Sequence, residues 1–282
     1  MHVAPFAPLS NRCVLVTGIS DDSSLALAVA REIRERGGRV VCTGLGPRRA
    51  PEGASERQVE HLTRSFELFR KTVDGELGAD VPTIDCDVSN DASLADLAHA
   101  LEALDLNIDG LVHAVAFDRT IRHGESARLI DTPRDAFLEC MNVSAYSLIA
   151  LLRTLIESGR LGEEASAVAL SYIGAERSVS HPYRNVAIAK ASLERIVKEL
   201  AVELGRAHAA RVNAVRFSPY SASRAGGAIP GLGEAEAHAD ANAPLGNATP
   251  EALAHEVAHL LQRGVGTTGE VRHVDGGYHV LA

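Results

Sequence analysis

The sequence lacks the features of several protein classes. Its net charge of −9 leaves no general excess of basic side chains for binding nucleic acid or an anionic membrane. No apolar run approaches the roughly 18 residues that are needed to cross a bilayer. Residues 1–13 carry no charged-then-apolar signal pattern, so we expect a cytoplasmic protein without nucleic-acid or membrane partners.

The cysteines include no Cys-x-x-Cys pair, and three of the four lie in apolar, strand-like runs. In a reducing compartment such residues serve as small buried hydrophobes, and we expect this of Cys13, Cys42, Cys86 and Cys140. His255 and His259 stand four residues apart but lack the glutamate pattern of a metalloprotease helix. We therefore expect no metal site.

What the sequence does contain is an alternation of short apolar runs with helical patterns, and 46% of its 282 residues are hydrophobic. The helical patterns include residues 25–36, 185–206 and 250–263. The expected strands are residues 13–16, 39–43, 83–86, 110–114, 167–171, 211–217 and 270–274. This alternation predicts an α/β protein, a single doubly wound Rossmann-type domain over residues 1–282 with a mostly parallel sheet of about seven strands.

Two segments interrupt the alternation. Residues 46–80 form an insertion with an extra helix, whose helical spacing of apolar residues indicates packing: Val59, Leu62, Phe66, Phe69 and Val73. Residues 220–247 are rich in Ala, Gly and Ser and follow a late strand. We expect this second segment to be a mobile, substrate-binding loop that covers a ligand.

The first strand runs into Gly18 and then into a helix that Ser24 and Leu25 open. This arrangement suits a pyrophosphate, because backbone N–H groups and the helix dipole point at it. Only Gly18 remains of a G-x-G-x-x-G pattern, so a capped helix after a plain loop is an equal alternative. Asp21 and Asp22 would repel an anion, and we expect them to point away from it.

Asp87 and Val88 end the third strand, where an Asp can accept from an adenine amino group. A cap on the following helix, or a plain turn, is an equal alternative for Asp87. The second strand ends without an acidic residue that would exclude a 2′-phosphate. Arg48 and Arg49 follow it and leave room for NADPH, although they can equally be solvated surface residues.

Tyr183 and Lys190 are seven residues apart, which brings them to one helix face if the helix begins near Tyr183. A nearby ammonium lowers the pKa of a phenol and can hold a ribose hydroxyl, so Tyr183 can act as a proton donor. Tyr172 ends the preceding strand and can face the same spot.

With these residues in view, the chain resembles the enoyl-acyl-carrier-protein reductases, a divergent branch of the short-chain dehydrogenase/reductase family. In that branch about ten residues separate a first Tyr from a second Tyr, and six residues separate the second Tyr from a Lys. The commoner branch has Tyr-x-x-x-Lys. Where the commoner spacing needs its Tyr, this chain has Val186. The similarity continues in order through nearly the whole chain, at residues 16–18, 24–26, 86–88, 111–117, 143–147, 211–214 and 269–277.

The resemblance implies a role for each matched residue. Tyr183 would donate to the substrate thioester oxygen, Lys190 would bind the nicotinamide ribose, and Tyr172 would line the substrate pocket. Substrate contacts are implied for Phe117, Tyr172 and Tyr183. Cofactor contacts are implied for Gly18, Ser24, Leu25, Asp87, Val88, Ala114, Val115, Ala116, Lys190 and Pro219.

The same resemblance implies NADH as the cofactor, with NADPH possible, and a homotetramer, for which helix faces at 132–157 and 185–206 supply apolar surface. The implied reaction is reduction of the 2,3-double bond of an enoyl thioester on acyl carrier protein or coenzyme A. It would belong to fatty-acid or related secondary-metabolite biosynthesis. Two alternatives remain: a reductase of a carbonyl or of a non-thioester alkene, and an inactive dinucleotide-binding protein.

The chain also departs from the family pattern. One extra residue separates Tyr172 from Tyr183, so we expect a reshaped loop at 178–181. Phe217 and Ser218 precede Pro219 where the family has a small residue and Gly. Ala222 stands where the family has a Thr that contacts the cofactor, so Ser221 or Ser223 would have to make that contact instead. Asn142 stands where the commoner short-chain dehydrogenases have an active-site Asn.

Overall fold

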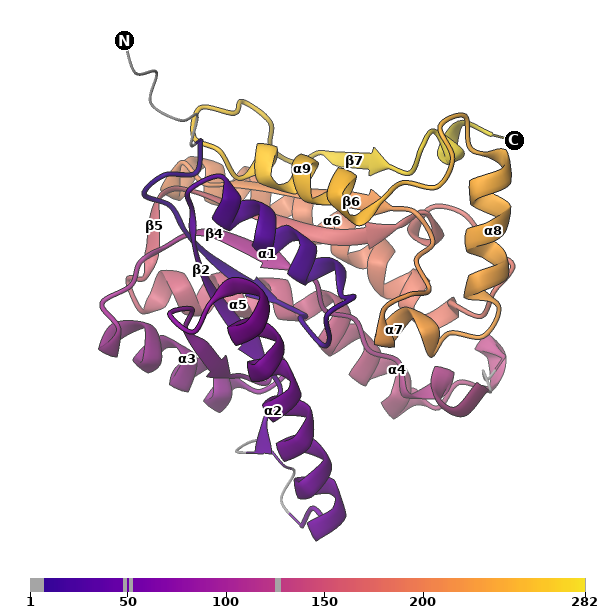
Figure 1. Ribbon diagram of the computed structural model, residues 1–282, viewed down its shortest axis with the longest axis horizontal. Coiled ribbons are helices and arrows are strands. Elements are labelled where there is room, and N and C mark those ends of the chain that lie inside the picture. The colour runs from indigo at the N-terminus through magenta and orange to yellow at the C-terminus, as the bar shows by residue number, and fades with distance from the viewer. Residues whose placement is uncertain (1–7, 48–49, 51–52, 125–127, 282) are drawn as a thin grey trace.

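The computed structural model describes residues 8–47, 50, 53–124 and 128–281. A seven-stranded sheet in the order β3-β2-β1-β4-β5-β6-β7 runs through its centre, and every neighbouring pair is parallel (Figure 1). This is the strand order of a doubly wound Rossmann-type domain, as expected from the sequence. The strands are β1 Cys13–Thr17, β2 Arg39–Gly44, β3 Thr83–Asp85, β4 Ile108–His113, β5 Leu161–Tyr172, β6 Arg211–Phe217 and β7 Val271–Val274.

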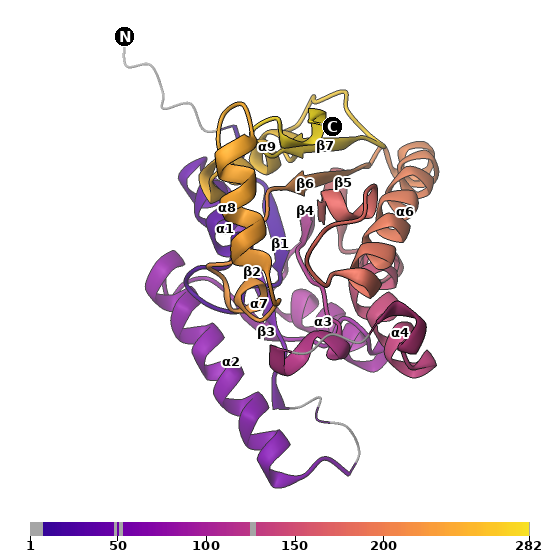
Figure 2. The ribbon, with the colours of Figure 1, turned by 90° about the vertical axis from the view of Figure 1, so that its right-hand side faces the viewer.

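Helices cover both faces of the sheet and close two separate apolar cores (Figures 1 and 2). One core joins the sheet to α1 Leu25–Glu35, α2 Glu56–Leu77 and α9 Pro250–Leu260. The other core joins it to α3 Asp91–Ala103, α5 Ser147–Glu157 and α6 Arg184–His208. All four cysteines are free and buried, as predicted.

The segment 46–80, expected to be an insertion, contains the crossover helix between the parallel strands β2 and β3, because α2 lies between them in the chain. Its apolar stripe packs only in part: Phe69 and Val73 are buried, whereas Val59 is 37% exposed. The amino-terminal half of α2 projects away from the body of the molecule (Figures 1 and 2). The segment is thus a crossover connection of the sheet.

A continuous helical stretch, Arg134–Glu157, crosses one face of the domain. It consists of α4 Arg134–Met141, a π-helical turn Asn142–Tyr146 and α5. Among the described residues it is the one helix long and apolar enough to cross a membrane by length and composition, and half of its most apolar window is buried. A search for uninterrupted apolar runs misses this helix, because single charged residues such as Arg153 divide it. A helix that packs on the core of a domain passes the same test, so this is weak evidence for a membrane span.

The segment 220–247, predicted as a loop, contains α7 Arg224–Gly227 and α8 Leu232–Asn242. Both helices lie at the edge of the molecule toward which the β6 and β7 arrows point (Figure 1). Their small residues show little apolar periodicity, which is why the sequence did not predict helices here. That the segment moves over a ligand stays a prediction.

Candidate active site

The carboxyl ends of β1 and β4 meet where the strand order reverses, which is where α/β sheets bind ligands. Thr17 joins the two strands: its hydroxyl donates to the Val112 carbonyl at 3.0 Å and accepts from the Ala114 N–H at 3.1 Å. Gly18 follows with φ +89°, and a Cβ there would overlap the Ala114 carbonyl oxygen. The close approach and the positive φ both require glycine at this turn.

The amino terminus of α1 lies directly after this turn. Ser24 is its N-cap residue, but its hydroxyl donates to the Asp21 carbonyl at 2.8 Å and makes no cap bond. No side chain in the described part of the chain therefore caps the first N–H groups of α1, and Leu25, half-buried, opens the helix. Such a terminus suits a pyrophosphate.

Asp21 is held by protein donors. Its carboxylate accepts from the Ser20 hydroxyl at 2.8 Å and from the backbone N–H groups of Ser23 and Arg224, each at 3.0 Å. Because Arg224 begins α7, this carboxylate ties the α1 turn to the 220–247 segment.

Asp87 makes a tight turn and does not cap the following helix. Its carboxylate accepts from the N–H and the hydroxyl of Ser89, at 2.9 and 2.6 Å, whereas Asn90 is the N-cap of α3. The capping alternative for Asp87 is therefore wrong. Val88 is buried beside it, and the contact of both residues with adenine stays a prediction.

An acidic side chain does lie at the tip of β2, but it comes from the neighbouring strand. The Asp85 carboxylate, at the end of β3, accepts from the Gly46 N–H at 2.8 Å. The sequence of β2 alone does not reveal this carboxylate, because it is the parallel pairing of Gly44 with Asp85 that brings the two strand ends together. Arg48 and Arg49 lie outside the described residues.

Tyr172 and Tyr183 meet at the carboxyl end of β5, and Lys190 binds the carbonyl of Leu170 in the same strand. Tyr172 ends β5 and Tyr183 is the N-cap residue of α6, and their rings meet edge to face with centroids 5.1 Å apart. Burial raises the pKa of both phenols, so both stay protonated across the neutral range.

Lys190 points at backbone carbonyl groups. Its Nζ donates to Leu170 O at 2.8 Å and to Val115 O at 3.2 Å. Burial lowers the pKa of Lys190 to about 8. The expectation that Lys190 lowers the pKa of Tyr183 is wrong here, because burial is the largest cause of the shift at Tyr183 and raises its pKa.

His181, which no sequence pattern pointed to, lies beside the two tyrosines. Its ring lies 5.6 Å from that of Tyr172 and 5.8 Å from that of Tyr183. It is 5% exposed, and neither ring nitrogen has a hydrogen-bond partner among the described residues. His181 lies in the 178–181 loop, which carries the extra residue between the two tyrosines. That this residue reshapes the loop stays a prediction.

The segment after β4 lies beside Lys190, whose ammonium binds the Val115 carbonyl. Ala116 is exposed, whereas the Phe117 N–H donates to the Ser144 hydroxyl at 2.9 Å in the π-helical turn. Asn142, at the start of that turn, donates to the Ser89 carbonyl at 3.3 Å. Its bond joins the helix to the β3–α3 connection.

The family threonine has no evident replacement after β6. Ala222 is exposed, the Ser221 hydroxyl donates to Glu236, and the Ser223 hydroxyl accepts from Gly226 N–H as the N-cap of α7. The Pro219 carbonyl accepts from the Asn247 side chain at 2.9 Å, which fixes the exit from β6. Cofactor contact by Pro219 stays a prediction.

A buried ion pair joins β6 to α6 next to Tyr172. Arg216 of β6 binds both carboxylate oxygens of Glu194 in α6, at 2.8 and 2.6 Å, and also pairs with Glu176. The Ser171 hydroxyl, next to Tyr172, donates to the same Glu194 carboxylate at 2.6 Å. This arrangement fixes β5, β6 and α6 relative to one another.

His273, Asp275 and His279 form a cluster at the end of β7, with ligand-type atoms all within 4.8 Å of one another. The His279 ring lies 2.8 Å from Asp275 Oδ1, which also accepts from the Gly277 N–H, and the two imidazoles stack at 3.9 Å. Stacked rings cannot both direct a lone pair at one ion. The expectation of no metal site stays a prediction.

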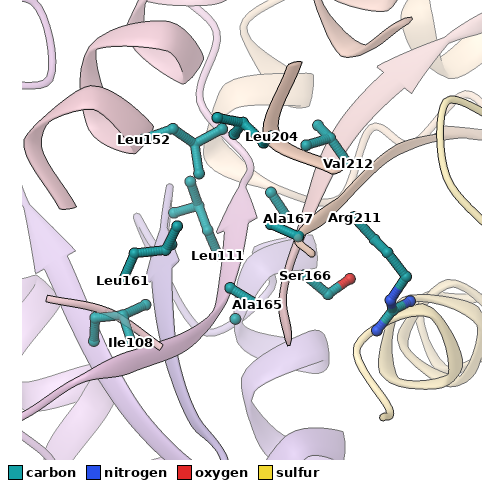
Figure 3. A pocket seen from close by; sticks show the side chains of 12 residues that line it. Ile108, Leu111, Leu152, Leu161, Ala165, Ser166, Ala167, Leu204, Arg211 and Val212 are labelled. Carbon is teal, nitrogen blue, oxygen red and sulfur yellow. The ribbon is translucent and has the colours of Figure 1, made fainter. Parts of the chain in front are cut away.

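A cavity lies at the opposite end of the sheet, where β4, β5 and β6 begin under α5 and α6 (Figure 3). Leu152, Leu204 and Ile108 line it, with Ser166 and Arg211 at its side. Its volume of about 10 Å³ is at most enough for one water molecule, so it is not a substrate site.

The strand order, the Gly18 turn and the Tyr183–Lys190 pair on α6 define a nucleotide-dependent oxidoreductase of the short-chain dehydrogenase class. A family model described as "Enoyl-(Acyl carrier protein) reductase" matches residues 18–279. The chain belongs to the enoyl-acyl-carrier-protein reductase family.

Known members are similar over nearly their whole length. The enoyl-[acyl-carrier-protein] reductase [NADH] FabI of Bacillus cereus is 32% identical over 275 residues, which are 97% of this chain and 98% of the relative. The corresponding enzyme of Aquifex aeolicus is 31% identical over 275 residues, which are 97% of this chain and 93% of the relative.

Solved structures agree. The Bacillus cereus enzyme with NADP+ and indole naphthyridinone has a TM-score of 0.82 at 29% identity, covering 97% of this chain and 98% of that one. The Aquifex aeolicus enzyme has a TM-score of 0.82 at 31% identity, and the match covers 98% of this chain and 99% of that one.

Proposed function

We propose that this chain reduces the 2,3-double bond of an enoyl thioester with NADH, and that Tyr183 and Lys190 are the residues that act. The observation that carries the proposal is the contact of Tyr172 with Tyr183 at the carboxyl end of β5, where Lys190 binds the Leu170 carbonyl, in a member of this family. NADPH is a second possible cofactor, since one solved relative was crystallised with NADP+.

The residues present fit a dinucleotide. Gly18 leaves room at the switch point, and the amino terminus of α1 has no side-chain cap among the described residues. Gly18, Ser24 and Leu25 would hold the pyrophosphate, Asp87 and Val88 would flank adenine, and Lys190 would hold the nicotinamide ribose. The segment Ala114, Val115 and Ala116, together with Pro219, would complete the cofactor site. When bound, NADH supplies the hydride.

Tyr183 would stabilise the charge that develops on the substrate. As the β-carbon is reduced, negative charge moves to the thioester oxygen, and a proton is then needed at the α-carbon. Burial keeps Tyr183 a neutral phenol, which can donate a hydrogen bond to that oxygen. Tyr172 and Phe117 would line the pocket and orient the acyl chain.

The direct experiment is to follow the loss of NADH absorbance with a crotonyl thioester, on coenzyme A and on acyl carrier protein. Turnover of the thioester is expected. Turnover of ketones alone would support a carbonyl reductase instead, and cofactor binding without turnover of any substrate would support an inactive dinucleotide-binding protein.

The carrier, the assembly and the location are part of the same proposal. A homotetramer is supported by apolar side chains that remain exposed on α4, the π-helical turn and α6: Leu138, Tyr146 and Val202. Acyl carrier protein as the thioester carrier follows from the names of the relatives. A cytoplasmic location agrees with four free cysteines.

A further inference from the structure

His181 combines burial with unmet hydrogen-bonding capacity. It is 5% exposed, and both of its ring nitrogens are inaccessible and lack a partner among the described residues. A neutral imidazole carries one N–H donor and one acceptor, and leaving both unpaired in a protein interior is costly. A buried polar group of this kind needs a partner that arrives with a ligand or with ordered water.

The surroundings of His181 indicate which ligand. Its ring contacts the rings of Tyr172 and Tyr183, at 5.6 and 5.8 Å between centroids, and these two rings contact each other at 5.1 Å. The three rings form a triangle, so His181 belongs to one aromatic cluster with Tyr183, the proposed donor to the substrate.

The 220–247 segment also approaches His181. A Cβ on Gly231, in the connection between α7 and α8, would lie 3.5 Å from the His181 Cβ. Gly231 has φ +75°, so this turn brings bare backbone against the histidine. His181 therefore contacts both tyrosines and also lies against the segment proposed to cover the substrate.

The chemistry of the imidazole suits a neutral, polar substrate group. Burial lowers the pKa of His181, so the ring is uncharged at neutral pH and can donate one hydrogen bond. A thioester oxygen is an acceptor, and it gains negative charge during the proposed reduction.

We propose that His181 is a substrate-binding residue whose ring N–H donates a hydrogen bond to the thioester oxygen of the substrate, beside Tyr183. This inference rests on the proposed function. It gives the proposed thioester site a second hydrogen-bond donor, which comes from the 178–181 loop.

The test measures kcat, KM and NADH affinity for His181→Phe, which keeps an aromatic ring and removes both nitrogens. We expect kcat/KM for a crotonyl thioester to fall about 10- to 100-fold, which corresponds to one hydrogen bond to a group that gains charge. The NADH dissociation constant should stay within about twofold. His238→Phe is the matched control, because His238 is exposed on α8 of the same segment and also contacts an aromatic ring, that of Tyr278.

A second pair of variants guards against poor folding of the first. The side chains of His181→Asn and His181→Leu have the same number of heavy atoms and the same branching, but only Asn keeps a donor. Asn should therefore retain more thioester turnover and tighter binding of the saturated product thioester. Equal values for the pair, or wild-type kcat/KM in His181→Phe, would overturn the role of His181 while the reductase activity stands. A wild-type protein that neither reduces nor binds thioesters would overturn both.

Discussion

The substitution Lys190→Met should leave the stability of the fold nearly unchanged while it weakens NADH binding. Burial lowers the pKa of Lys190 from 10.5 to about 8, so keeping the ammonium charged costs on the order of 3 kcal/mol in the folded protein at neutral pH. The substitution removes this cost but also gives up the bonds to Leu170 O and Val115 O, at roughly 1.5 kcal/mol each. The two terms balance, so the free energy of unfolding should change by no more than about 1 kcal/mol.

In Lys190→Met, NADH affinity should change much more than the free energy of unfolding. A charge-assisted bond to the ribose is worth about 1.5–3 kcal/mol, so NADH affinity should fall roughly 10- to 100-fold in Lys190→Met. Urea unfolding and NADH fluorescence titration measure the two quantities. Lys198→Met is the control, because Lys198 lies exposed on the same helix.

The pH dependence of the unfolding free energy tests the lowered pKa of Lys190. Because the pKa of Lys190 is lower in the folded state, the folded protein releases this proton first, and the unfolding free energy should rise between about pH 8 and pH 10. That rise should be smaller in Lys190→Met. A loss of more than about 3 kcal/mol in the variant at neutral pH, with NADH affinity unchanged, would refute the reasoning.

Three further predictions concern stability, cofactor choice and assembly. Arg216→Met should cost about 3–5 kcal/mol of stability, because it leaves the Glu194 carboxylate buried and unpaired; thermal melts of this variant and of its combination with Glu194→Gln would check this, and a loss below about 1 kcal/mol would contradict it. Changing Arg48 and Arg49 together to Ala should weaken NADPH by about 1–3 kcal/mol and leave NADH nearly unaffected; equal losses in titrations of the two cofactors would show that the arginines do not bind the 2′-phosphate. Sedimentation should give the mass of four chains, and a mass of one chain in dilute buffer would argue against the tetramer.

Much of the fold was predictable because strands and helices have different apolar periods. The bounds of β6, Arg211–Phe217, were predicted correctly from a continuous β-rich run. β5 begins at Leu161, several residues before the expected start, because the exposed Glu163 and Glu164 hide its amino-terminal half. The helices α7 and α8 were missed because a stretch of Ala, Gly and Ser offers no apolar stripe.

The site was predictable only in part. The spacing of Tyr183 and Lys190 placed Tyr183 at the start of α6 and Lys190 two turns into it, and the strand-turn-helix pattern placed Gly18 in the turn before α1. The burial of His181 was not predictable, because it depends on how the lengthened loop folds against Tyr172 and Gly231. The direction of the Tyr183 pKa was also wrong, since a desolvation effect cannot be read from spacing.

The central claim is that Tyr183 donates to the thioester oxygen. The most direct measurement compares steady-state kinetics of Tyr183→Phe and Tyr172→Phe with NADH and a crotonyl thioester, alongside NADH titration of each variant. Tyr183→Phe should lower kcat by ~10²–10³-fold with NADH affinity near that of the wild type, whereas Tyr172→Phe should mainly change KM. Full turnover by Tyr183→Phe, together with its loss in Tyr172→Phe, would contradict the account and reverse the roles of the two tyrosines.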